Sequence, residues 1–219
     1  PFSGLQSQWA RVSGARTYVS DSACRQGRRS EPHSRPLVRA RSARMPLAAR
    51  SSPSANANAA HGLSHVMFEQ GEMETGRTFL SQWMPAHDRQ SFLHGHLAWH
   101  VALTMLDAGD TDGALAIYEQ QIKPAGRPYP PLNIFTDGTS LLWRLSLAGR
   151  TGLESHWQDM AAYGEKYFPQ AGAHFADVHF ALAAAAGSDA FDARLAQLEA
   201  REAGGKLAPG RAAIDLCRG

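Results

Sequence analysis

The chain has 219 residues, two cysteines and a formal net charge of +2 at pH 7. Its length leaves room for one or two domains, and no run of about eighteen apolar residues predicts a membrane span. Cys24 and Cys217 lie near opposite ends with no C-x-x-C spacing, which argues against a disulfide framework or a zinc ribbon. We therefore expect a cytoplasmic protein with no membrane partner.

The charge is divided unevenly along the chain. Residues 1–60 carry ten arginines, no lysine and only two acids, Asp21 and Glu31, an excess of eight positive charges. Residues 61–219 carry the other twelve basic residues against eighteen acids, so this part is acidic. A nucleic-acid partner would have to bind the basic N-terminal segment, and we expect none elsewhere.

Residues 1–55 are rich in Arg, Ser and Pro and show neither helical nor strand periodicity. Such a composition buries too little apolar surface to offset the entropy of ordering, so the segment is predicted to be disordered. Three interpretations stay open: a solvated basic tail, a targeting segment, or a stretch read out of frame that is not the natural partner of residues 56–219.

Residues 56–219 predict an all-α fold built from helical hairpins. Four units of helix, glycine and helix align on Gly71, Gly109, Gly149 and Gly187, at spacings of 38, 40 and 38 residues. Each glycine supplies the left-handed backbone position that ends a helix. The spacing is close to the roughly 34 residues of the tetratricopeptide repeat, which predicts an α-solenoid of that type.

Small and aromatic residues recur at fixed distances from these glycines. In the second unit Ala102 precedes Gly109, and Ala114 and Tyr118 follow it, a pattern that allows two helices to approach closely. The first unit repeats the scheme around Gly71 with Ser64, Gly76 and Leu80. The prolines within 124–131 and 169–172 separate the units. Residues 208–219 read as the opening of a further helix, so we expect a truncated array whose ends favour self-association.

Histidine is the chemically most informative residue type in this region. His61 and His65 are four residues apart, as are His96 and His100, so each pair shares one face of a helix. In this repeat type the first helix of each unit lines the inner surface of the array. The candidate groove residues are His61, His65, His96, Trp99, His100, Asp137, Arg144, His174, Asp177 and His179.

Three interpretations of these residues stay open. They could form a hydrogen-bonded polar seam that fixes how the repeats stack. They could line a groove for a peptide or small ligand. They could also bind Zn²⁺ or Fe²⁺ through His61, His65, His96, His100 and Asp137, or act as general acids and bases. No other cofactor is predicted, because the chain has no Walker loop, no G-x-G-x-x-G and no H-E-x-x-H.

Several phrases of the sequence together resemble one family. They are His61-xxx-His65, residues 96–103, Asp137 with residues 142–145, and residues 175–179. In these phrases residues 56–219 resemble the C-terminal part of the tetratricopeptide repeat protein 38 family. The resemblance implies an α-helical superhelix in a cytoplasmic protein and supplies no established reaction.

These observations favour a helical-repeat interaction module rather than an enzyme. Its concave groove, lined by His, Asp and Trp, would hold a protein, a peptide or a small ligand. One alternative is a metal-dependent or acid–base enzyme of hydrolase type that uses the same histidines. The other is a structural fragment with no activity of its own.

Overall fold

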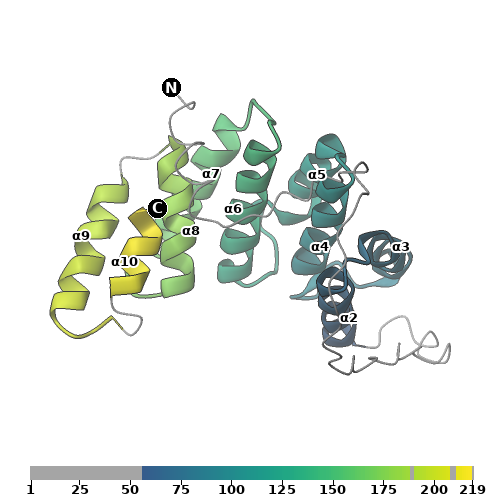
Figure 1. Ribbon diagram of the computed structural model, residues 1–219, viewed down its shortest axis with the longest axis horizontal. Helices are drawn as coiled ribbons and strands as arrows, with labels where there is room; N and C mark the ends of the chain where they lie inside the picture. The colour runs from purple at the N-terminus through teal and green to yellow at the C-terminus, as the bar shows by residue number, and fades with distance from the viewer. Residues whose placement is uncertain (1–55, 188–189, 208–210, 219) are drawn as a thin grey trace, which may run out of the picture. The chain divides into compact units, whose positions relative to one another are not determined.

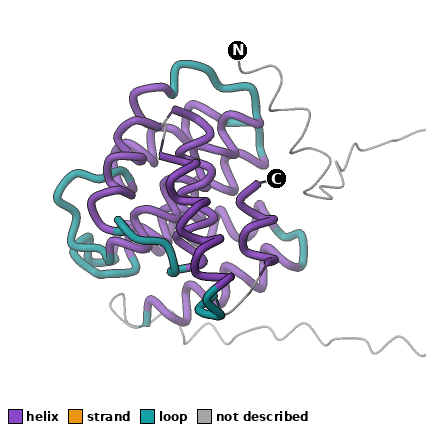
Figure 2. Tube along the Cα trace, turned by 90° about the vertical axis from the view of Figure 1, so that its left-hand side faces the viewer, coloured by secondary structure: helices purple, strands orange, loops and turns teal. Residues whose placement is uncertain are grey.

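The computed structural model describes residues 56–187, 190–207 and 211–218. Every described residue belongs to one unit of the chain, Pro53–Gly219. The regular structure in these ranges is helical throughout and contains no strand (Figures 1 and 2). This confirms the predicted all-α class for the described part. The disorder predicted for residues 1–55 lies outside it.

Over the described ranges the helices follow one another as four hairpins and a last single helix. The hairpins are α2 (Ala57–Glu69) with α3 (Met73–Trp83), α4 (His94–Asp107) with α5 (Thr111–Ile117), α6 (Pro131–Leu147) with α7 (Glu154–Tyr167), and α8 (His174–Gly187) with α9 (Ala190–Ala203). The last helix is α10 (Arg211–Arg218), a 3₁₀ turn (Met84–Ala86) follows α3, and a π-helical stretch (Tyr118–Ile122) continues α5. No helix in the described ranges is both long and apolar enough to span a membrane.

Three of the four turn glycines behave as the sequence predicts, and the fourth, Gly187, is the last residue of α8. Gly71, Gly109 and Gly149 have φ angles of 72°, 79° and 85°, and each follows the end of a first helix. In all three turns the residue after the glycine donates its backbone N–H to the carbonyl five residues earlier, as in Arg150 to Leu145 at 2.9 Å. These bonds form the Schellman closure, which favours glycine because L side chains strain the left-handed conformation. Gly205 closes α9 in the same way.

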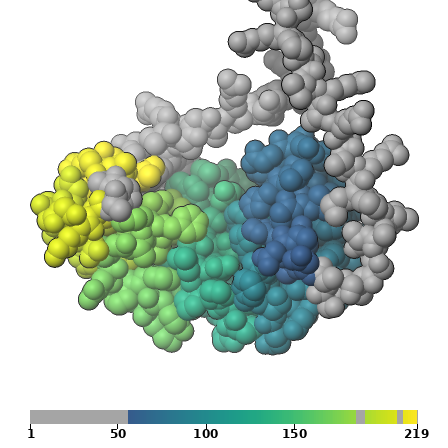
Figure 3. Space-filling view, turned by 90° about the horizontal axis from the view of Figure 1, so that it is seen from below, coloured from purple at the N-terminus to yellow at the C-terminus, as the bar shows by residue number. Residues whose placement is uncertain are grey.

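The hairpins pack against one another in chain order. The first helices α4, α6 and α8 lie side by side, α3 packs on α4, α7 packs on α8, and α10 packs on α8 and α9 (Figure 1). Figure 3 shows the same succession on one face, where the colours pass from dark blue through green to yellow. Because the first helices are neighbours, side chains far apart in sequence meet along them.

The small and aromatic residues identified in the second unit form the centre of the core. Ala102, Ala114 and Tyr118 are all completely buried, in one cluster with side chains of α6, α7 and α8. In the first unit, Ser64 and Leu80 are buried as well. The predicted close approach of paired helices therefore holds in both units.

The tryptophans of the hairpins pack against the core clusters. Trp157 is buried in the central cluster, and Trp99 and Trp143 lie partly buried against it. Trp83 packs in the same manner against the cluster beneath α2 and α3. Cys217 is buried in a third cluster, where burial raises the pKa of its thiol to about 11. A thiol in that state is a small apolar side chain rather than a nucleophile.

Candidate metal centre

Four histidines from two helices converge where the first two described hairpins meet. His61 and His65 project from α2, and His96 and His100 project from α4. Each pair is separated by one helical turn, so its two rings stand one above the other on the same helix face. One nitrogen of each ring lies within 4.8 Å of those of the other three. It is the only such group of His, Cys and acidic side chains in the described ranges.

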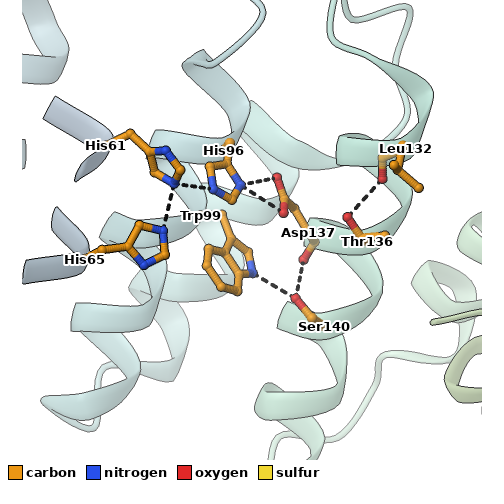
Figure 4. Close-up of polar contacts among 8 residues, drawn as sticks. All are labelled: His61, His65, His96, Trp99, Leu132, Thr136, Asp137 and Ser140. Atoms are coloured by element: carbon orange, nitrogen blue, oxygen red, sulfur yellow. Dashed lines mark hydrogen bonds and ion pairs between the residues drawn. The ribbon is translucent and has the colours of Figure 1, made fainter. Parts of the chain in front are cut away.

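Three of these rings meet at a single atom. The Nε2 atom of His65 lies 2.8 Å from Nε2 of His61, and Nε2 of His96 lies 2.9 Å from the same atom (Figure 4). The ring of His100 closes the group, with its centroid 4.6 Å, 5.0 Å and 5.2 Å from those of His65, His96 and His61. His100 is buried, and its Nε2 has no hydrogen-bond partner.

Asp137 of α6 fixes the orientation of one ring in the cluster. Its Oδ1 and Oδ2 atoms lie 3.1 Å and 2.9 Å from Nδ1 of His96. A carboxylate accepts hydrogen bonds, so Nδ1 of His96 carries a proton, and in the neutral form of the ring Nε2 presents a lone pair to His61. Carboxylates hold metal-ligating histidines in this manner, selecting the tautomer and raising the basicity of the ligand nitrogen.

This tautomer leaves too few protons for a hydrogen-bonded seam. An imidazole nitrogen offers one in-plane position, either a proton or a lone pair. With a lone pair on His96, a proton on Nε2 of His61 would have to serve both His96 and His65. The buried Nε2 of His100 would still lack a partner. A cation among the four rings would instead satisfy all the lone pairs at once, because imidazole nitrogens are good transition-metal ligands.

The electrostatics of the cluster keep the rings of His61 and His100 neutral. Burial, together with the neighbouring His96 and His65, lowers the pKa of His61 to about 4. Burial and the same histidine neighbours lower the pKa of His100 to about 3. Both rings are therefore unprotonated at neutral pH. Their lone pairs are available without displacing a proton, as metal binding requires.

Trp99 connects the histidine cluster to side chains of α6. Its ring stacks on that of His96 at a centroid distance of 5.5 Å and an angle of 12°. Its Nε1 donates a hydrogen bond to Oγ of Ser140 at 2.9 Å. On α6 the guanidinium carbon of Arg144 lies 5.6 Å from the Trp99 ring centre, a cation–π distance. The sequence patterns did not single out Ser140, which orients this ring.

His179 of α8 extends the polar surface beyond Asp137. Its Nδ1 donates to the backbone carbonyl of Phe175 at 2.7 Å. Burial lowers the pKa of His179, and the carboxylate of Asp137 partly opposes that shift. Pairwise contacts thus link the candidate groove residues His61, His65, His96, His100, Trp99, Asp137 and Arg144 across α2, α4 and α6, and on α8 His179 lies close enough to Asp137 for the carboxylate to act on its pKa.

Asp177 and His174 lie away from this surface. Asp177 is completely buried and pairs with Arg194 of α9, whose Nε lies 3.2 Å from Asp177 Oδ1. Its Oδ2 accepts a hydrogen bond from the backbone N–H of Gly172. His174 is partly buried, with its Nδ1 lacking a hydrogen-bond partner. The sequence placed Asp177 beside the groove, but the structure uses it to join α8 to α9.

The comparisons with known proteins leave the site to be judged from its own geometry. No family model matches the chain, and no solved structure matches it. The function is therefore inferred from the side chains of the site.

Proposed function

We propose that this protein binds one transition-metal ion through His61, His65, His96 and His100. The observation that carries the proposal is the meeting of three Nε2 atoms at 2.8–2.9 Å, beside a buried fourth imidazole without a partner. Asp137 supplies the hydrogen bond that metal-ligating histidines require on their far nitrogen.

The spacing of the nitrogens suits a small tetrahedral ion. Zn–N bonds near 2.0–2.1 Å place the nitrogens of a tetrahedral site about 3.3–3.4 Å apart. The four nitrogens here lie within 4.8 Å of one another, and the shortest contacts are below 3 Å. Small rotations of the rings therefore suffice to surround an ion. An all-imidazole ligand set favours Zn²⁺, with Fe²⁺ as the alternative, over the hard cations Mg²⁺ and Ca²⁺.

One side of the centre faces solvent. His65 is exposed, His61 and His96 are half-buried, and His100 is buried. An ion would therefore enter from the side of His65. Four protein ligands are typical of a structural zinc site, whereas catalytic zinc keeps a position open. The geometry favours the structural kind, and the hydrolase alternative would require His65 to leave the ion.

A second proposed function is the interaction module expected from the sequence. We propose that the hairpins form a tetratricopeptide-like array of the kind suggested by the family resemblance, with a protein or peptide bound along its first helices. Its support is the chain of contacts that runs from the histidines through Trp99 and Asp137 to Arg144, with His179 near Asp137. A peptide-array screen in which Arg144→Ala loses the bound sequences would support it, and equal binding by both proteins would contradict it.

The metal proposal is tested on the purified full chain without a polyhistidine tag. Its metal content is measured, and its melting temperature is recorded with a chelator and then with Zn²⁺, Fe²⁺ or Mn²⁺. We expect one Zn²⁺ per chain and a higher melting temperature, because an ion that binds only the native state stabilises it. His65→Ala and His100→Ala should lose this response.

The matched control is His156→Ala. His156 lies on α7, where its Nε2 pairs with Glu119 at 3.2 Å, outside the four-histidine cluster. This variant should bind Zn²⁺ like the unaltered protein. If the unaltered protein binds no metal and its melting temperature is unchanged by Zn²⁺, the proposal is wrong and the histidines form a structural seam.

A further inference from the structure

The first described helix, α2, has a small buried interface. Its buried side chains are the two small residues Ala60 and Ser64. Of its larger apolar residues, Leu63 and Met67 are partly buried, whereas Val66 and Phe68 are 50% and 48% exposed. By comparison, eight of the fourteen residues of α4 are buried. Apolar burial is the main source of helix stability in proteins, so α2 gains less from packing than α4 does.

The intrinsic stability of α2 is also low. The helix has 13 residues, a length at which isolated helices are marginal in water. Gly62 stands in its interior, where an added Cβ would meet nothing within 4 Å, so no close packing requires glycine there. Glycine is among the poorest helix formers. The helix begins after Asn56, which is held in the left-handed conformation at φ 82°.

The packing beneath α2 leaves a small hollow where α2, α3 and α4 meet. Most of its wall is apolar, and the metal-site candidate His100 forms part of it. The residues that line it include Met67 and Phe68 from α2, Leu80 from α3, and Leu103 and Thr104 from α4.

The histidine cluster is the polar link between α2 and α4. α2 packs mainly on α3 and touches α4 over a small area. His61 contacts His96 through their Nε2 atoms at 2.9 Å, and the rings of His65 and His100 meet edge to face at 4.6 Å. Through Asp137 the same link reaches α6 (Figure 4).

We propose that metal occupancy of the four-histidine centre controls the docking of α2 onto α4. This inference rests on the metal site proposed above. With an ion bound, His61 and His65 fasten α2 to His96 and His100. Without it, α2 keeps only its small contacts and separates from α4 more often, while α4, α6 and α8 stay packed. The metal is therefore a switch that controls the docking of one helix and does not hold the other hairpins together.

Hydrogen exchange on the full chain tests this switch. Exchange of the α2 amides is followed by mass spectrometry in a chelator and in Zn²⁺, and bound zinc is counted on the same samples. At a free Zn²⁺ concentration about 100 times the dissociation constant, linkage predicts about 100-fold slower exchange for amides whose opening releases the metal. Amides of α6 and α7 should exchange at the same rate in both conditions.

The results distinguish a failure of this inference from a failure of the proposed metal site. Slower exchange confined to α2, with one zinc per chain, supports the switch. One zinc per chain with unchanged exchange in α2 overturns the switch and leaves the metal site standing. Equal slowing in every helix also overturns it, because the metal would then stabilise the whole fold. If no zinc binds, both proposals fail.

Three variants complete the experiment. His65→Ala removes an exposed ligand and is therefore the substitution of the four least disruptive to folding. In this variant α2 should exchange as fast in Zn²⁺ as in the chelator, with the rates in α6 unaltered. His156→Ala should keep the full effect of Zn²⁺. A zinc-dependent slowing of α2 that persists when both of its ligands are removed, His61→Ala together with His65→Ala, would contradict the switch.

Discussion

Nδ1 of His96 lies 2.9 Å from Oδ2 of Asp137, although 41 residues separate the two side chains in the sequence. Asp137 is buried, so burial raises the pKa of its carboxyl, while the hydrogen bond from His96 opposes that shift. The contact turns Nε2 of His96 toward the other histidines. A carboxylate in this place makes the ring a stronger ligand, so removing its charge should weaken the metal site.

Replacing Asp137 by Asn should weaken zinc binding about 10- to 100-fold while leaving the fold intact. The amide oxygen can still accept the hydrogen bond from His96, but the negative charge that strengthens the ligand is lost. A competition titration against a chromophoric chelator measures the change. Thr136→Ala, one residue away on α6, is the control and should bind zinc normally. Equal affinity for Asp137→Asn and the unaltered protein would contradict the assigned role of Asp137.

The visible absorption of bound Co²⁺ should show that the site is tetrahedral. Co²⁺ replaces Zn²⁺ readily and absorbs visible light far more strongly in tetrahedral than in octahedral coordination. We expect intense visible bands that saturate at one Co²⁺ per chain and disappear when Zn²⁺ is added. His100→Ala should remove one nitrogen ligand and alter the bands. Weak bands of octahedral type in the unaltered protein would show that the four nitrogens do not surround the ion.

The metal-free protein should lose stability as the pH falls below about 6.5. The pKa of His61 is about 4 and that of His100 about 3 in the folded chain, against 6.5 for an unperturbed histidine. Between these values the unfolded chain binds more protons, so acid favours unfolding and the loss ends below the folded pKa values. Urea unfolding in a chelator at pH 7, 5.5 and 4.5 measures this. His100→Gln should flatten the pH dependence, and an identical slope would contradict the prediction.

Substitution by alanine should change the free energy of unfolding in opposite directions at two helical glycines. At Gly164 of α7 an added Cβ would lie 2.7 Å from Cε2 of Phe135, whose ring is fully buried. Gly164→Ala should therefore lower the free energy of unfolding by about 1–3 kcal/mol. At Gly62 the space is open, so Gly62→Ala should raise it by roughly 0.5–1 kcal/mol. Urea unfolding compares the two, and equal signs would contradict the packing assigned to these two helices.

Breaking the ion pair between Asp177 and Arg194 should lower the free energy of unfolding far more than breaking an exposed ion pair. Both side chains are buried, so Arg194→Ala leaves a carboxylate without its partner and should cost about 3–5 kcal/mol. Arg211 and Asp215 on α10 form the matched exposed pair, at 3.2 Å with both side chains more than half exposed. Arg211→Ala should leave the stability unchanged in the same unfolding experiment, since exposed pairs contribute little.

The helical hairpins were predictable from the sequence because their signals are local. A glycine that must adopt positive φ ends a helix whatever lies around it, and Gly71, Gly109 and Gly149 do so where expected. The pairing of His61 with His65 and of His96 with His100 on one helix face also follows from the helical period alone. The burial of the small residues Ala102 and Ala114 was predictable from their spacing around Gly109.

The contacts between helices could not be predicted in this way. Asp137 and Asp177 both lie on first helices, yet Asp137 contacts His96 of α4 whereas Asp177 contacts Arg194 of α9. The meeting of His61 with His96 depends on how α2 is placed against α4, which no local pattern specifies. Local sequence patterns specify the helices, their turns and the faces on which the histidines stand. The packing between helices brings four imidazoles to one point, because contacts across helices depend on rotations and offsets that the whole core sets.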